Sequence, residues 1–266
     1  MPRFMKKILR KAILPLMLAS TISVKAQEAN VVFTNSLING TIGLIGSAVN
    51  EKNIYEGFAQ GFLGGTLVGL GKYWVGENAN GAWGAKIVSS IGNSITYNTA
   101  RGDNSLDMIM MDIGPVLLTY HKNKGFKPYI LAKSTYDLII TISEGYEFDF
   151  NESLKRGTPI FNGGRMYGLH GLARSNILII EEHDPRLTQI LRHELVHSYQ
   201  YSQSFALESL LRNIPVMEEI NNFSDKYYLK FDYSHYFLME FQANLWEYDS
   251  RPLEIEANIL AKKSKF

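Results

Sequence analysis

A run of glycines spaced four residues apart, in the segment GFAQGFLGGTLVGLG, restricts this chain to few folds. Residues four apart are neighbours on the surface of a helix, so these glycines would form one smooth stripe. Each glycine weakens a helix by about 1 kcal/mol relative to alanine. A second helix packed closely against the stripe is therefore expected to compensate for that loss. The stripe consists of Gly57, Gly61, Gly65 and Gly69.

The whole region from about Val31 to Ile95 is rich in small residues and is expected to be helical. Its helices either insert into a membrane as a hairpin or pack tightly within the protein. The apolar stretch Gly57–Gly71 has only 15 residues, which is short for a membrane span, and the preceding segment carries Asn35 and Asn39. Internal packing or peripheral membrane association is therefore favoured over insertion. Self-association through the stripe is a further alternative.

Residues 1–26 predict an export signal. Basic residues crowd the first eleven positions, the apolar run AILPLMLASTISV is too short to span a bilayer, and VKA resembles a cleavage site. Cleavage is expected after Ala26, and an uncleaved N-terminal anchor is the alternative. The chain has no cysteine, which excludes disulfides and thiolate metal sites. We expect an exported bacterial protein, periplasmic or associated with the cell envelope.

The charge of the chain is nearly balanced, with 27 basic and 26 acidic residues. Such a chain has no strong field to attract a polyanion, so nucleic acid is not an expected partner. Its 266 residues suffice for one large domain, or for a domain with an appendage.

The residue pattern changes twice along the chain, from helical to strand-like and back. Between about residues 96 and 182, LDMIMMDIGPVLLTYH, KPYILAKSTYDLIITIS and NILIIEE are rich in β-branched and aromatic residues, with turn-like clusters between them. From Pro185 onward, apolar residues return to helical spacing. This order predicts an α+β fold with glycine-rich N-terminal helices, one small and mostly antiparallel sheet, and a helical C-terminal half. The expected division is a helical region, 27–95, and a second domain, 96–266.

Three helices are expected in the C-terminal half. Asp184 followed by proline is a good helix start, and the long helix after it should end before Pro215. A second helix is expected at about Tyr233–Tyr248. A third should run from about Pro252 towards the C-terminus.

The first of these helices contains RHELVH, in which His193 and His197 lie four residues apart. Both imidazoles then project from one helix face with about 6 Å of rise between them, so both can bind one metal ion. Glu194 lies beside the first histidine, where it can hold a water molecule. This pattern is typical of zinc hydrolases, provided that a third ligand exists.

Two glutamates qualify as the third ligand. Glu240 begins EFQAN and Glu254 begins EIEAN, and both segments fit glutamate-x-x-Ala-Asn. An uninterrupted helix would place the two about 21 Å apart, so only one of them can bind the same ion as the histidines. The residues alone leave this choice open.

The combination of HELVH with the downstream SRPLEIEANILA resembles the gluzincin class of zinc metallopeptidases. It is most similar to the branch in which the third ligand is a glutamate within S-R-x-x-E-x-x-A-[D/N]. The resemblance covers about residues 192–263 and implies Glu254 as third ligand, with Ser250 and Arg251 in the lead-in. Glu240 lacks this lead-in. Asn258 stands where the family often has an aspartate that orients a ligand histidine, and its neutral amide should make that histidine less basic.

The resemblance also implies the activity and further residues. The protein would hydrolyse peptide bonds in peptides or proteins, with Glu194 as the base that activates a zinc-bound water. An extended substrate would pair with an exposed edge strand at Ser175–His183, although the same segment is equally consistent with an ordinary buried strand. Candidates for stabilising the oxyanion are Tyr248, His235 and Arg251.

A function of a different class is also compatible with the sequence. The chain could be a non-catalytic binding or structural protein of the cell envelope, assembled through its glycine-rich helices, with a structural or decayed metal site. A catalytic zinc keeps an open coordination position, whereas a structural zinc is closed by a fourth protein ligand. The intact Glu194 favours catalysis, because a structural site needs no base there.

Overall fold

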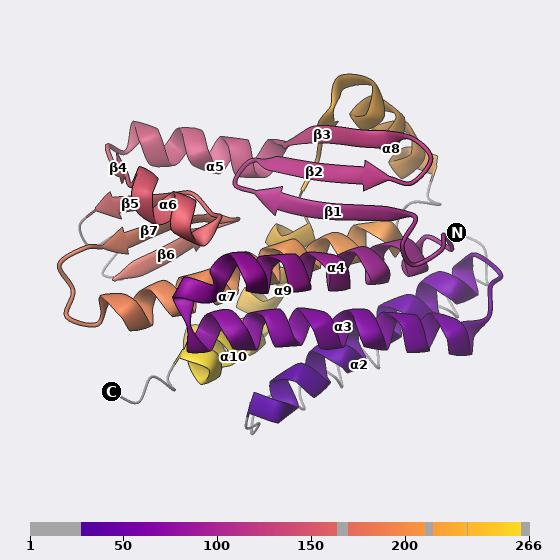
Figure 1. Cartoon of the computed structure of the whole chain (residues 1–266), viewed down its shortest axis with the longest axis horizontal. Helices are drawn as coiled ribbons and strands as arrows, with labels where there is room; N and C mark the ends of the chain where they lie inside the picture. Colours follow the sequence, from indigo (N-terminus) through magenta and orange to yellow (C-terminus); the bar gives the residue numbers. More distant parts are fainter. Residues whose placement is uncertain (1–27, 164–169, 211–214, 233, 262–266) are drawn as a thin grey trace.

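This α+β protein, which we describe from a computed structural model, has two small sheets that lie along one side of a group of long helices (Figure 1). The described residues are 28–163, 170–210, 215–232 and 234–261. The predicted export signal and Tyr233, the expected first residue of a helix, lie outside them.

The glycine-rich region forms three long helices that run side by side: α2 (Glu28–Val49), α3 (Ile54–Glu77) and α4 (Ala82–Ala100), with a 3₁₀ turn η2 (Ala79–Gly81) before α4 (Figure 1). The glycine stripe of α3 faces α2. A Cβ atom added to Gly61 would lie 2.2 Å from the carbonyl oxygen of Asn39, and one added to Gly65 would lie 2.2 Å from that of Asn35. The chain therefore covers this stripe with its own backbone.

Helix α2 is the one described helix that is long and apolar enough to cross a membrane, by length and composition alone. It lies near the N-terminus, which is weakly compatible with an anchor or an export signal. More than half of its apolar window is buried inside the protein, as the core helix of a soluble protein would also be.

The first sheet has the strand order β1-β2-β3-β8. Its members are β1 (Met108–Ile113), β2 (Val116–His121), β3 (Gly125–Leu131) and β8 (Leu229–Lys230). The first three form an antiparallel meander, and β8 pairs parallel to β3. Met110 and Leu117 of this sheet pack with Tyr201 and Phe205 of the following helical half.

The segment KPYILAKSTYDLIITIS, predicted to be a strand, is strand only up to Leu131. Helix α5 (Ala132–Ser143) begins immediately after it. The carboxylate of Asp232 accepts hydrogen bonds from the backbone N–H groups of Lys133, at 2.7 Å, and Ser134, at 3.0 Å. This distant aspartate satisfies unpaired donors of the first turn, so tertiary structure overrides the β propensity of the segment.

The second sheet has the order β4-β5-β7-β6. It contains β4 (Glu147–Phe148), β5 (Ile160–Gly163), β6 (Gly171–Arg174) and β7 (Ile177–Glu181), and helix α6 (Phe150–Arg156) connects β4 to β5. Strands β5 and β7 are parallel, and the other pairs are antiparallel. The prediction of one small sheet was therefore wrong, because α5 interrupts the strand region and the strands form two sheets. Two of the three pairings in each sheet are antiparallel, which agrees with the expected mostly antiparallel pairing.

The expected edge strand at 175–183 is also corrected. Strand β7 pairs with β5 on one side and with β6 on the other, so its backbone is not free. Among the described strands, β6 is the edge neighbour of β7.

The C-terminal half contains α7 (Leu187–Leu210), α8 (Pro215–Tyr227), α9 (Ser234–Leu245), the 3₁₀ turn η3 (Tyr248–Ser250) and α10 (Pro252–Ala261). Pro215 begins α8, a helix that the sequence did not predict, as proline favours the first turn of a helix. Helix α7 contacts α3, α4 and α10.

One core joins the two halves of the chain. It combines Val75 and Ala85 of the glycine-rich helices with Leu178 of β7, Leu195 of α7 and Leu260 of α10. The expected division after residue 95 falls within α4.

Candidate metal centre

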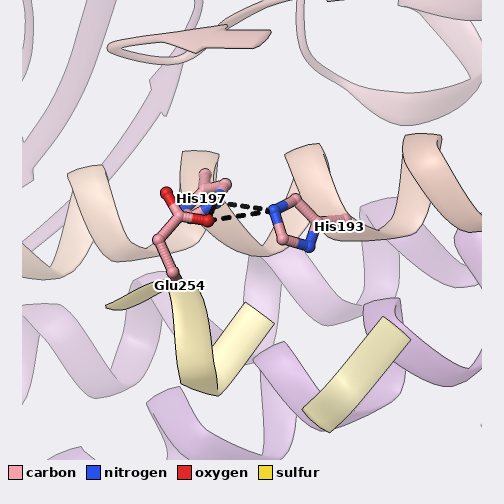
Figure 2. Close-up of side chains that lie close together, drawn as sticks. All are labelled: His193, His197 and Glu254. Carbon is pink, nitrogen blue, oxygen red and sulfur yellow. Dashed lines mark hydrogen bonds and ion pairs between the residues drawn. The ribbon is translucent and has the colours of Figure 1, made fainter. Parts of the chain in front are cut away.

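Three side chains from two helices converge at the centre of α7 (Figure 2). His193 and His197 project from one face of α7, and Glu254 comes from the first turn of α10. The two histidine Nε2 atoms lie 3.0 Å apart. Glu254 Oε2 lies 3.4 Å from each of them. The structure thus brings together the residues that the motifs singled out.

These distances suit a small cation with tetrahedral coordination. Zinc binds nitrogen and oxygen ligands at about 2.0–2.2 Å, so two ligands of a tetrahedral site are separated by about 3.3–3.5 Å. The three measured separations, 3.0, 3.4 and 3.4 Å, lie close to that range. Two imidazoles and one carboxylate are also a donor set that zinc accepts. The residues therefore fit the metal that the motif implies.

The electrostatics of the cluster favour a positive charge between its members. Burial by itself lowers the pKa of His197, but the hydrogen bond and charge of Glu254, together with Glu194, raise it to about 9. Burial acts to raise the pKa of Glu254, yet the two histidines hold it well below its usual range. Both shifts favour a positive charge beside Glu254, and a metal cation bound by the same atoms would compete with a proton for them.

Glu194 lies beside this cluster and against strand β6. Its side chain is 6% exposed, and the backbone of Ala173 in β6 hydrogen-bonds to it. A Cβ atom at Gly171 would lie 2.9 Å from Glu194 Oε1, so the glycine gives the carboxylate room. Burial raises the pKa of Glu194 against the opposing charges of His197 and His193. A raised pKa suits a carboxylate that accepts and returns a proton.

Glu240, the alternative third ligand, lies on the exposed face of α9. Its carboxylate hydrogen-bonds the hydroxyl of Tyr236 one turn earlier and raises the pKa of that tyrosine. Glu240 is not part of the group that contains Glu254 and the histidines.

Of the three candidate oxyanion donors, Tyr248 lies nearest to the cluster. Its hydroxyl hydrogen-bonds Glu254, and burial together with the charge of Glu254 raises its pKa. The guanidinium of Arg251 lies 5.1 Å from the centre of the Tyr248 ring. The ring of His235, in the first turn of α9, lies 5.7 Å from that of Tyr201 on α7.

His235 should make the protein's stability depend on pH. Burial, with the nearby charges of His197, Lys133 and Lys72, lowers its pKa to about 3, below an unfolded value of about 6.5. The unfolded chain therefore binds this proton first, so stability falls as pH decreases from about 6.5 towards 3. Lowering the pH from 7 to 5 should cost on the order of 2 kcal/mol through this group.

Urea unfolding of the parent and of His235→Phe at pH 7 and pH 5 measures that contribution. The variant should lose less stability than the parent between the two pH values. Equal losses would show that folding does not lower the pKa of His235.

A residue that the motifs did not single out is Gln200, one turn after His197 on α7. Its Oε1 lies 2.7 Å from His197 Nδ1. Asn258, which the resemblance implied as the orienting residue, is half-buried on α10, and in the described part of the chain it is not the partner of His197. The i, i+3 spacing of His197 and Gln200 is the sequence signal for this contact.

A second group of metal-capable side chains lies beyond β6, where His170 meets Glu181 and Asp184. His170 Nδ1 lies 2.7 Å from Glu181 Oε2 and 2.5 Å from Asp184 Oδ2. Arg186 also hydrogen-bonds Asp184. The carboxylates of Glu181 and Asp184 both lie next to Nδ1 of His170. Arg186 already balances the charge of Asp184. We interpret this group as an ion-pair cluster.

Comparison with known protein families, with curated proteins and with solved structures finds no match to this chain. The resemblance to gluzincins therefore rests on the motifs around Glu194 and Glu254 and on their geometry.

Proposed function

We propose that this protein is a zinc-dependent metallopeptidase of gluzincin type that hydrolyses peptide bonds in peptides or proteins. The observation that carries the proposal is the convergence of His193, His197 and Glu254 at near-tetrahedral separations. A buried glutamate, Glu194, lies directly beside them.

Zinc held by the three ligands would lower the pKa of a bound water and polarise the scissile carbonyl. Glu194 accepts the proton of the attacking water and delivers it to the leaving amine. Tyr248 is the best-placed donor for the developing oxyanion, since its hydroxyl already reaches Glu254. It is also 45% exposed, so a substrate can approach it from solvent.

Strand β6 is the surface to which an extended substrate would bind. It is the edge strand of the described sheet, and its Ala173 hydrogen-bonds Glu194. A peptide paired with β6 would therefore run past the catalytic base. We therefore assign to β6 the substrate-binding role that the resemblance implied for the segment of the next strand, β7.

Among the described residues, three side chains could hold the ion, so a bound zinc would have a fourth coordination position for water. This favours a catalytic site over the structural or decayed site of a non-catalytic envelope protein. Export to the periplasm belongs to the same proposal, and the signal-like sequence of residues 1–26 supports it.

Zinc stoichiometry tests the proposal directly. We expect the mature chain from Gln27 to bind one equivalent of zinc, measured by elemental analysis after dialysis. Glu254→Ala should lose it, because the carboxylate supplies one of three ligands. Glu240→Ala is the matched control and should keep it, since Glu240 lies on the exposed face of α9.

A parent chain that binds no zinc would overturn the proposal. Zinc lost equally from both variants would also contradict it, because the assignment of Glu254 would then have no support. Only selective loss in Glu254→Ala agrees with the geometry.

A further inference from the structure

A lysine buried in the glycine-rich helices lies at the centre of a polar network that reaches the candidate metal centre. Lys72 of α3 is 1% exposed, and its ammonium group lies 3.0 Å from Glu256 Oε2 on α10. It also donates to Asn35 Oδ1 at 3.0 Å and to Gln203 Oε1 at 2.5 Å. A buried charge is retained only where it is paired and hydrogen-bonded, as this one is.

Glu256 connects this lysine to α7. Its Oε1 accepts a hydrogen bond from Asn35 Nδ2 at 2.6 Å, and its Oε2 accepts one from Gln200 Nε2 at 2.7 Å. Gln200 Nε2 also donates to the carbonyl oxygen of Leu253 at 2.9 Å. We call Asn35, Lys72, Gln200, Gln203 and Glu256 the buried network.

These contacts fix the orientation of the Gln200 amide. A carboxylate and a carbonyl only accept hydrogen bonds, so the group facing both of them must be the NH₂ of Gln200. The amide oxygen then faces His197 Nδ1, at 2.7 Å. An oxygen at this position accepts a hydrogen bond from Nδ1, so Nδ1 carries a hydrogen. Nε2, which faces His193 and Glu254, is then the nitrogen that can bind a metal ion.

We propose that Gln200 is a positioning residue for His197, and that Glu256 and Lys72 hold it in the orientation that presents Nε2 to the metal. The N-terminal helices thus contribute to metal binding although they contain no ligand. This inference rests on the proposed zinc site and adds to it the part of the chain that the resemblance to gluzincins does not cover.

The test compares zinc dissociation constants, measured by competition with a chromophoric chelator. Gln200→Leu should bind zinc about 10–100-fold more weakly than the parent. The double variant Lys72→Met/Glu256→Gln removes both charges together. The new amide at position 256 can donate as well as accept hydrogen bonds, so it no longer holds the side chain of Gln200 in one orientation. This double variant should bind zinc roughly tenfold more weakly.

Lys86→Met is the matched control for the loss of a buried lysine. Lys86 is 4% exposed on α4 and donates to the carbonyl of Asp112 and to Thr158, outside the buried network. Its zinc affinity should equal that of the parent even if its stability falls. Circular dichroism tests whether each variant folds. If Gln200→Leu does not fold, the zinc affinity of the double variant Lys72→Met/Glu256→Gln tests the inference instead.

Nitrogen-15 NMR of zinc-loaded protein with labelled histidine supplies a readout besides affinity. The parent should show an exchange-protected proton on His197 Nδ1, and Gln200→Leu should lose that protection. Parent-like affinity and protection in folded variants would overturn the inference while leaving the zinc site intact. Absence of zinc from the parent would instead remove the proposed function.

Discussion

Replacing Glu194 by glutamine is expected to abolish peptide hydrolysis and to leave one equivalent of zinc bound. Glutamine keeps the shape of the side chain but cannot accept the proton of the attacking water. General acid–base catalysis contributes about 10²–10⁴-fold to a rate, so a loss of that size is expected. A quenched-fluorescence peptide library, with zinc measured on the same samples, checks both parts.

Glu240→Gln is the control for this experiment, because it makes the same chemical change on the exposed face of α9. It should leave both zinc and hydrolysis unchanged. Hydrolysis that survives in Glu194→Gln would mean that another group is the base or that a contaminating peptidase is present. Loss of zinc from Glu194→Gln would mean that this carboxylate supports the ligands rather than the reaction.

The candidate ligands could be found from the sequence because their geometry is local. His193 and His197 are four residues apart, and helix periodicity places both rings on one face. The choice between Glu254 and Glu240 was less local, and it depended on the lead-in of a family motif. The structure places Glu254 at the histidines and Glu240 at the surface.

The buried network could not be predicted in this way. Lys72 and Glu256 are separated by 184 positions, and nothing in either local sequence indicates the other. Helix α5 was missed for a similar reason, because Asp232 stabilises its first turn from 98 or 99 positions away. The edge strand depended on strand order, which a single sequence does not reveal. Each error concerns a long-range contact.

The glycine stripe leads to the second large prediction, a strong loss of stability in Gly65→Leu. A Cβ atom alone would lie 2.2 Å from the carbonyl oxygen of Asn35 and 2.7 Å from Ser36 Cα. Because these are backbone atoms, α2 and α3 must separate to relieve the overlap. Overpacking typically costs about 1–3 kcal/mol, and we expect the upper end of that range here because backbone atoms must move. Thermal unfolding of the parent and the variant in detergent-free buffer measures it, with an expected drop of roughly 6–12 °C.

Ala59→Leu is the matched control, since Ala59 is on the exposed side of the same helix. Its melting temperature should stay close to that of the parent. If Gly65→Leu melted like the parent in a detergent-free monomer, α2 would not cover the stripe in solution. If only Gly65→Leu is destabilised, the glycines are required for the close packing of α2 against α3. That close approach also places Asn35 and Lys72 beside Glu256, so the stripe and the buried network would have a common cause.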